Sequence, residues 1–246
     1  MTYCVALKLR AGLVCLSDTR TNAGVDNISR FKKMFTWGVD GERAVCLMTA
    51  GNLSITQGVI TQVDTALKRA AAGEEVETIL NAASLYRVAE LIGEYMGAMQ
   101  EKYREALNEH GAAGDASVIV AGQRAGGDHR LFMVYSPGNF IEAEDDSPYL
   151  QIGEHKYGKP ILDRVIAPET PLSRALKAVY VSMDSTLRSN LSVGMPLDLA
   201  VIRAGEHRFA VNRRIEADDA EFNEISERWS GALRDAFASI PDIAGV

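Results

Sequence analysis

The order of strand-like and helix-like segments is the feature that most limits what this chain can fold into. Paired short strands come first, then two helices, more strands, two further helices, a last strand pair and a closing helix. A parallel sheet would instead alternate single strands with single helices. We therefore expect an α+β fold in which two antiparallel sheets stack and a helical layer covers each outer face.

Apolar periodicity, turn residues and capping residues mark the individual segments. The clearest helix has apolar residues at helical spacing at Val88, Leu91, Ile92, Tyr95, Met96 and Met99. The other expected helices follow Asn52 and span residues 160–166, 172–187 and 222–237, and the expected strands span residues 2–9, 13–16, 33–37, 43–50, 117–121, 131–135, 149–152, 197–203 and 208–211. Thr170 and Pro171 are expected as N-cap and first-turn residues of the helix that follows them. No linker is recognisable, so residues 1–246 are expected to form a single domain.

Composition and charge argue against several classes of protein. The net charge of −7 disfavours a nucleic-acid partner, because such binding depends on clustered Lys and Arg. No apolar run approaches the ~18 residues that span a bilayer, and no secretory signal is visible, so we expect a cytoplasmic protein without a membrane partner. The three cysteines are widely spaced, which predicts buried reduced thiols. The four scattered histidines predict neither a metal site nor a cofactor.

Thr2 directly follows the initiator methionine. A small second residue permits removal of that methionine, which would leave a hydroxyl nucleophile and an α-amine base on one residue. Many chains begin with Met-Thr by chance, so the hypothesis needs partners. Asp18 comes sixteen residues later, just past an apolar strand, and Lys33 starts the next strand. A lysine held by an aspartate would depress the pKa of the amine, which is ordinarily about 7.7–8.0.

The stretches TYCVALKLRAGLVCLSDTR, FKKMFTW and CLMTAGNLS resemble β-type subunits of the proteasome superfamily. Within that superfamily, YLQIGEHKYGKPILDR and DSTLRSNLSVGMPLDLAV are most similar to the bacterial ancestral β-subunit (Anbu) family. The resemblance extends over nearly the whole chain. It implies a four-layer αββα sandwich of the N-terminal nucleophile hydrolase type.

The resemblance also implies roles for single residues. Thr2 would be the nucleophile, Asp18 and Lys33 its partners, and the backbone N–H of Gly51 the oxyanion donor. The family's lysine usually falls one residue later relative to the threonine. A one-residue deletion before Lys33 accounts for this, with Lys32 as the alternative.

Further positions follow from the same resemblance. Arg20 would brace Asp18, and Thr49 would line the pocket for the residue before the scissile bond. Asp184 and Ser189 would support the threonine from a nearby loop. The related HslV peptidase binds a cation through that loop. Whether this chain binds a sodium ion there is left open by the sequence.

One position departs from the superfamily pattern. Gly153-Glu154-His155 stands where proteasome β-subunits and HslV have Gly-Ser-Gly. A carboxylate at Glu154 would bind a protonated amine and raise its pKa, the reverse of what a neutral base needs. Activity would then be slow, unless Glu154 itself takes part in proton transfer.

The leading hypothesis is a threonine-type endopeptidase that forms an acyl-enzyme ester on Thr2 and releases it with water. A small-molecule amidohydrolase of the same fold is one alternative. A self-assembling subunit with an inert site is another, and Glu154 favours it. The resemblance implies a homo-oligomer, either a ring or an open spiral, that acts on peptides or proteins without a cofactor. The sequence leaves open whether an unidentified ATP-dependent unfoldase is a partner.

Overall fold

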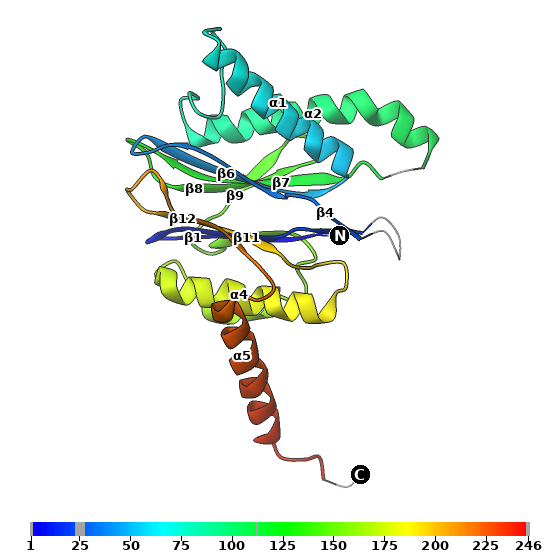
Figure 1. Cartoon of the computed structure of the whole chain (residues 1–246), viewed down its shortest axis with the longest axis vertical. Coiled ribbons are helices and arrows are strands. Elements are labelled where there is room, and N and C mark those ends of the chain that lie inside the picture. The colour runs from blue at the N-terminus through cyan, green and yellow to red at the C-terminus, as the bar shows by residue number, and fades with distance from the viewer. Residues whose placement is uncertain (1, 23–27, 112, 245–246) are drawn as a thin grey trace.

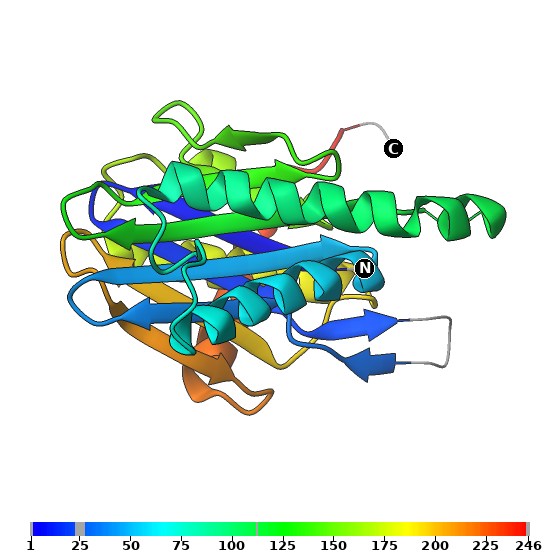
Figure 2. The same ribbon diagram turned by 90° about the horizontal axis from the view of Figure 1, so that it is seen from above.

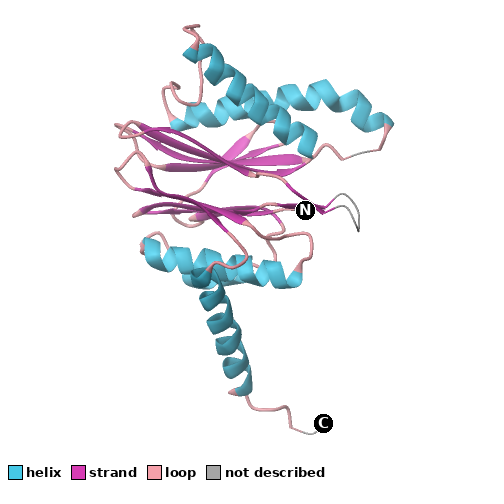
Figure 3. Ribbon diagram, in the orientation of Figure 1, coloured by secondary structure: helices cyan, strands magenta, loops and turns pink. Residues whose placement is uncertain are grey.

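The structure is a computed structural model that describes residues 2–22, 28–111 and 113–244. Figures 1 and 3 show two sheets stacked face to face, with α1 and α2 over the outer face of one sheet and α4 over the outer face of the other. This agrees with the mixed α and β content and the antiparallel sheets expected from the order of segments.

The first sheet has the strand order β10-β1-β2-β11-β12, and all its pairs are antiparallel. Its strands are β1 (Tyr3–Leu9), β2 (Gly12–Asp18), β10 (Tyr149–Gly153), β11 (Leu197–Arg203) and β12 (Phe209–Ile215). Tyr3 pairs with Gly153, and Leu197 pairs with Asp18. The register therefore places the start of β1, the end of β2 and the end of β10 at the same end of the sheet.

The second sheet has the order β5-β6-β7-β8-β9 and is also antiparallel. Its strands are β5 (Met34–Val39), β6 (Arg43–Gly51), β7 (Ala116–Arg124), β8 (Arg130–Tyr135) and β9 (Phe140–Glu142). A short hairpin of β3 (Arg20–Asn22) and β4 (Ile28–Arg30) connects β2 to β5 and lies beside the sandwich in Figure 2. The hairpin and β9 were not predicted, because three residues are too few for an alternating pattern.

The helices are α1 (Leu53–Ala71), α2 (Leu85–Glu109), α3 (Lys159–Val165), α4 (Leu172–Ser189) and α5 (Ala220–Ala238). Asn52 caps α1 by accepting from the N–H groups of Ser54 and Ile55, as expected for an N-cap asparagine. The predicted cap of α4 was wrong by one residue. Pro171 is the N-cap itself, with extended backbone angles, and Leu172 is the first helical residue.

Three apolar clusters fill the spaces between the layers. Along β1 the side chains alternate: Val5 and Leu7 face α4, whereas Cys4 and Ala6 face the second sheet. Met96 and Met99 pack in the cluster beneath α1 and α2, as predicted. The three cysteines are buried free thiols, which was also predicted.

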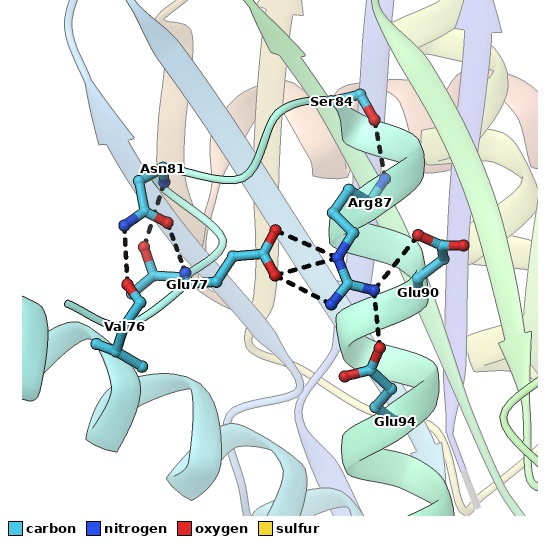
Figure 4. Close-up of polar contacts among 8 residues, drawn as sticks. Val76, Glu77, Asn81, Ser84, Arg87, Glu90 and Glu94 are labelled. Carbon is cyan, nitrogen blue, oxygen red and sulfur yellow. Dashed lines mark hydrogen bonds and ion pairs between the residues drawn. The ribbon is translucent and has the colours of Figure 1, made fainter.

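Charged side chains hold the segment between α1 and α2. Arg87 forms ion pairs with Glu77 at 3.0 Å, Glu94 at 2.7 Å and Glu90 at 3.4 Å, and Figure 4 shows the guanidinium at their centre. Beneath this segment, Arg43 donates to two of its backbone carbonyls, at Ile79 and Ala82. The two arginines together hold the segment that connects α1 and α2.

The helix α5 behaves differently from the other long helices. Phe222 near its start is buried against α4, but Figure 1 shows its far end pointing away from both sheets. None of the helices in the described ranges is both long and apolar enough to cross a membrane. Those ranges also contain no group of three or more His, Cys, Asp or Glu placed to hold a metal ion.

Candidate active site

Thr2 lies at the head of β1, at one end of the sandwich, and is 7% exposed. Its carbonyl oxygen accepts from the N–H of Glu154 at 2.7 Å. Gly153 has a φ of +82°, and a Cβ there would lie 1.9 Å from the Thr2 oxygen, so this contact requires glycine. By the alternation of β1, the Thr2 side chain shares a face with Cys4 and points toward the second sheet.

Asp18 ends β2 and is fully buried. Its Oδ1 accepts from the N–H of Tyr3 at 3.0 Å and from Nζ of Lys33 at 2.7 Å. Its Oδ2 accepts from the N–H groups of Arg20 at 3.1 Å and Gly194 at 3.2 Å. Burial raises the pKa of Asp18, and the Lys33 ammonium and the backbone donors oppose that rise. Asp18 therefore joins the start of β1 to the lysine of the opposite sheet.

Lys33 lies directly before β5, and its side chain is 5% exposed. Besides Asp18, Nζ donates to the carbonyl of Arg20 at 2.5 Å. Lys32 is exposed, and its ammonium lies 5.3 Å from the centre of the Phe35 ring. Of the two alternatives, the structure thus places Lys33 against Asp18.

The direction of the Gly51 N–H follows from the strand pairing. In an antiparallel strand, successive N–H groups point to opposite neighbours. The N–H of Thr49 donates to the backbone carbonyl of Lys33, on the β5 side, at 2.9 Å. The N–H of Asn52 donates to the backbone carbonyl of Asp115, on the β7 side, at 2.8 Å. The N–H of Gly51 therefore points to the same side as that of Thr49, past the start of β5. Gly51 has a φ of +101°, and a Cβ there would lie 2.2 Å from the Asp115 oxygen.

Arg20 acts on the site through a loop. Its backbone N–H contacts Asp18, but its guanidinium donates to the carbonyl of Leu191 at 3.0 Å. The guanidinium also packs so closely on Gly194 that a Cβ there would lie 2.1 Å from Nε. Arg20 thus holds the loop that presents the Gly194 N–H to Asp18.

Asp184 and Ser189 were expected to support Thr2 from a loop, but both lie in α4. Asp184 on α4 accepts from Ser226 of α5 at 2.7 Å and from Arg188 at 3.1 Å. Ser182, two residues earlier, contacts the hydroxyl of Tyr3 at 2.6 Å, so it faces β1. Side chains two positions apart on an α-helix point in directions that differ by about 200° around the helix axis. Asp184 therefore faces α5 and not β1. Ser189 ends α4 and is exposed.

The remaining predicted residues lie near Thr2. Thr49 is buried, and its hydroxyl lies 3.5 Å from the carbonyl of Lys33. Glu154 binds Thr2 through its backbone, and its carboxylate lies 3.9 Å from Nζ of Lys156. The structure thus groups the predicted nucleophile, ion pair and glycine at one end of the sandwich.

Two parts of the site were missed from the sequence. Gly194 lies 176 residues from Asp18, and no local pattern connects them. The hydroxyl of Tyr3, whose pKa is raised by burial, accepts from Gln151 at 2.6 Å and contacts Ser182. These contacts tie the head of β1 to β10 and α4. An apolar strand that begins with a tyrosine was the only available signal.

Comparison with solved structures identifies the family. The Anbu (Gly-1) mutant from Hyphomicrobium sp. strain MC1 is 44% identical to this chain, with all of both chains covered and a TM-score of 0.89. The chain belongs to the Anbu family. Anbu (ancestral beta-subunit) from Yersinia bercovieri is 40% identical, with 99% of each chain covered and a TM-score of 0.90. The Anbu complex from Pseudomonas aeruginosa, solved as a helical assembly, is 43% identical, with 99% of this chain and 98% of that chain covered and a TM-score of 0.90.

No family model and no curated protein matched the chain. The Anbu relationship therefore stands on solved structures alone. Anbu is related to proteasome β-subunits, in agreement with the resemblance drawn from the sequence.

Proposed function

We propose that this chain is the subunit of a threonine-type endopeptidase, built as a four-layer N-terminal nucleophile hydrolase sandwich. The observation that carries the proposal is the buried ion pair of Lys33 and Asp18 at the head of β1, with the Gly51 N–H directed to the same side. A buried ion pair is costly to place in a fold. Its position beside Thr2 gives it a chemical purpose.

The mechanism begins with removal of Met1, which lies outside the described residues. The freed α-amine of Thr2 takes the proton of its own hydroxyl, and the oxygen attacks a peptide carbonyl. The Lys33 ammonium favours the neutral form of the amine. The negative charge that develops on the carbonyl oxygen is received by the Gly51 N–H. The α-ammonium group of Thr2 passes its proton to the leaving nitrogen, and the amine product departs. The neutral α-amine then takes a proton from water, which hydrolyses the threonine ester and regenerates the hydroxyl of Thr2.

Glu154 adjusts this chemistry in the proposed mechanism. Its N–H donates to the Thr2 carbonyl, and its carboxylate lies 3.9 Å from Nζ of Lys156. In the proposed mechanism this carboxylate adds negative charge to the surroundings of the Thr2 amine. That charge favours the protonated amine and works against Lys33. Replacement of Glu154 by serine is therefore expected to raise turnover near neutral pH.

The proposal includes self-assembly. A structure of the Pseudomonas aeruginosa relative is described as a helical assembly of the Anbu complex. For this chain we infer a homo-oligomer in the cytoplasm, which acts on peptides and proteins. Folded proteins would need an unidentified ATP-dependent unfoldase as a partner. Enclosure of the sites would restrict access of folded proteins to Thr2.

The test is turnover of a peptide library by the wild-type chain and by Thr2→Ala, together with the intact mass of the purified protein. The proposal predicts loss of the methionine mass, cleavage of peptides and no cleavage by Thr2→Ala. Active protein that quantitatively retains Met1 would overturn the free-amine mechanism. Hydrolysis of small amides without cleavage of peptides would assign the site to an amidohydrolase.

A further inference from the structure

A cavity of about 600 Å³ lies at the end of the sandwich opposite Thr2. Gly51 ends β6 at the Thr2 end, and Arg43 begins the same strand. Because a strand rises about 3.4 Å per residue, roughly 27 Å separates these two positions. The cavity is lined by the end of β1, the turn between β7 and β8 and the start of α2, and Figure 2 shows that turn at the other end of the sandwich from the chain start. It therefore borders both sheets and one helical layer, and we call it the far cavity.

The far cavity contains an arginine without a counterion. Its lining holds four basic side chains and three carboxylates. Two of the carboxylates, Glu142 and Asp145, lie within ion-pair distance of three of the basic side chains: Lys8, Arg10 and Arg130. The fourth basic side chain, Arg124, is half-buried and forms no ion pair with any described residue.

A second arginine without a carboxylate partner stands directly opposite Arg124. Arg43 and Arg124 are partners in the register of β6 and β7, so their side chains share a face of the sheet. Arg43 is 4% exposed and donates to the backbone carbonyls of Ile79 and Ala82, while its Nε has no partner among the described residues. Burial and the charge of Arg124 lower the pKa of Arg43, and Glu42 opposes them as the weakest of these three causes. Like charges in this position repel each other, and an anion in the far cavity would relieve that repulsion.

The walls of the far cavity are held in place by contacts within the chain. The ring Nε2 of His129, in the turn between β7 and β8, donates to the carbonyl of Leu9 at the end of β1, at 2.6 Å. The helix α2 begins at Leu85, which lines the cavity, and its first turn holds no acidic residue. The cavity is thus formed in advance, which lowers the entropic cost of binding a ligand.

The chemistry of the lining favours a phosphoryl group. The guanidinium of Arg124 can bind two oxygens of one anion through its planar fork of N–H groups. The backbone N–H groups at the start of α2 add donors from a second direction. A tetrahedral phosphoryl group, which carries about −1.5 to −2 charge at pH 7, has oxygens for both sets of donors. A carboxylate has only two oxygens, and they lie in one plane.

We propose that the far cavity binds the phosphoryl group of a small molecule between Arg124 and the start of α2. This second site goes beyond the proposed peptidase and does not depend on its chemistry. A ligand there contacts both sheets and the layer of α1 and α2, so its binding should stabilise the folded chain.

The first experiment is isothermal titration calorimetry of the full chain at an ionic strength fixed with sodium chloride. The probes are inorganic phosphate, glycerol 3-phosphate, glycerol and acetate. We expect saturable binding of the two phosphates and none of glycerol or acetate. Tighter binding of glycerol 3-phosphate would identify a phosphorylated small molecule as the source of the group, and tighter binding of inorganic phosphate would identify free phosphate. No saturable binding of either phosphate, or equal binding of acetate, would overturn the proposal.

The second experiment repeats the titration with variants of opposite expected sign. Arg124→Gln should weaken phosphate binding by about tenfold or more, because it removes the charged donors. Asp128→Asn should strengthen it by about twofold to fivefold, because Asp128 is an exposed carboxylate of the lining without an ion-pair partner among the described residues. Arg234→Gln, at an exposed position of α5 outside the cavity, is the matched control and should bind like the wild type.

The melting temperatures of the same proteins without phosphate test the repulsion between the two arginines. Arg124→Gln should melt at a slightly higher temperature than the wild type, and added phosphate should raise the melting temperature of the wild type but not that of Arg124→Gln. A lower melting temperature of Arg124→Gln would remove the basis of the proposal. Phosphate affinity that is unchanged in Arg124→Gln, or not increased in Asp128→Asn, would show that phosphate does not bind in the far cavity.

Discussion

Two ionic clusters in this molecule differ in burial more than in the number of their charges. Arg87 meets three carboxylates, and its side chain is 30% exposed while those of its partners are 39–57% exposed. Lys33 pairs with the carboxylate of Asp18, and these two side chains are only 5% and 0% exposed. Figure 4 shows the first cluster on the outer helical layer, whereas the second lies between the sheets at Thr2. The larger cluster fastens a loop, and the smaller one forms the candidate site.

The physical reason is solvation. Water and salt screen exposed charges, so surface ion pairs contribute little to stability. A buried charge has lost its hydration and depends on its partner. The pair of Lys33 and Asp18 therefore links folding and chemistry, and changes to the two clusters should have very different effects.

The largest effect is expected for Lys33→Ala. Turnover should fall by about a thousandfold or more, as for other removed catalytic groups. The sequence alone predicts that this variant keeps the fold, because the task of Lys33 is electrostatic. Asp18 would, however, be left as an unpaired buried carboxylate, so the free energy of unfolding should fall by about 3 kcal/mol.

Peptide kinetics and urea unfolding of Lys33→Ala provide the measurement. Lys32→Ala is the matched control, because Lys32 is exposed and should change neither quantity. If Lys32→Ala were inactive and Lys33→Ala active, the assignment of the site lysine would be wrong.

A smaller effect is expected for Gly194→Ala. The added Cβ would lie 2.1 Å from Nε of Arg20, so the loop must move and the N–H at position 194 leaves Asp18. Turnover should drop by about tenfold, the cost of one charge-assisted hydrogen bond. Gly97→Ala is the control, since its Cβ would meet nothing within 4 Å. Equal turnover in both variants would mean that the loop does not position Asp18.

The pH dependence should be moderate and should run in opposite directions for activity and stability. The pKa of Asp18 is raised by burial, and its charged form is the one that pairs with Lys33. As pH falls through that raised pKa, Asp18 takes a proton and turnover declines. The protonated form is the one that burial favours, so this residue's contribution to stability is present at low pH and is lost as pH rises through the same pKa.

Two pH series measure this prediction, one of kcat/KM and one of urea unfolding for wild type and Asp18→Asn. The stability of the wild type relative to Asp18→Asn should decrease as pH rises. A decline of activity and relative stability together on acidification would contradict it.

The smallest effect is expected for Arg87→Ala. Its three ion pairs are exposed, so the melting temperature should fall less than in Lys33→Ala, and high salt should remove the difference. Peptide turnover should not change. A loss of stability as large as that of Lys33→Ala would show that burial does not distinguish the two clusters.

The sequence predicted those parts of the site that lie at the ends of apolar strands. Asp18 and Lys33 were found because a charged residue directly after or before an apolar run is visible locally. Gly194 was not, because only the pairing of β11 with β2 brings it to Asp18. Asp184 lies on a helix, and which face of α4 turns toward β1 is decided by packing of the whole layer. The direction of the Gly51 N–H likewise depends on pairing with strands on either side.

The proposed chemical groups are divided between the two sheets. Thr2 directly precedes β1 and Asp18 ends β2 of the first sheet, whereas Lys33 directly precedes β5 and Gly51 ends β6 of the second. A sliding of one sheet over the other by a fraction of an ångström would change the separation of nucleophile and oxyanion donor. The donor acts only when it lies about 2.7–3.1 Å from the position of the oxyanion. The turnover rate would therefore respond to any sliding of the two sheets against each other. A neighbour that presses on the layer of α1 and α2 would alter the rate without touching Thr2.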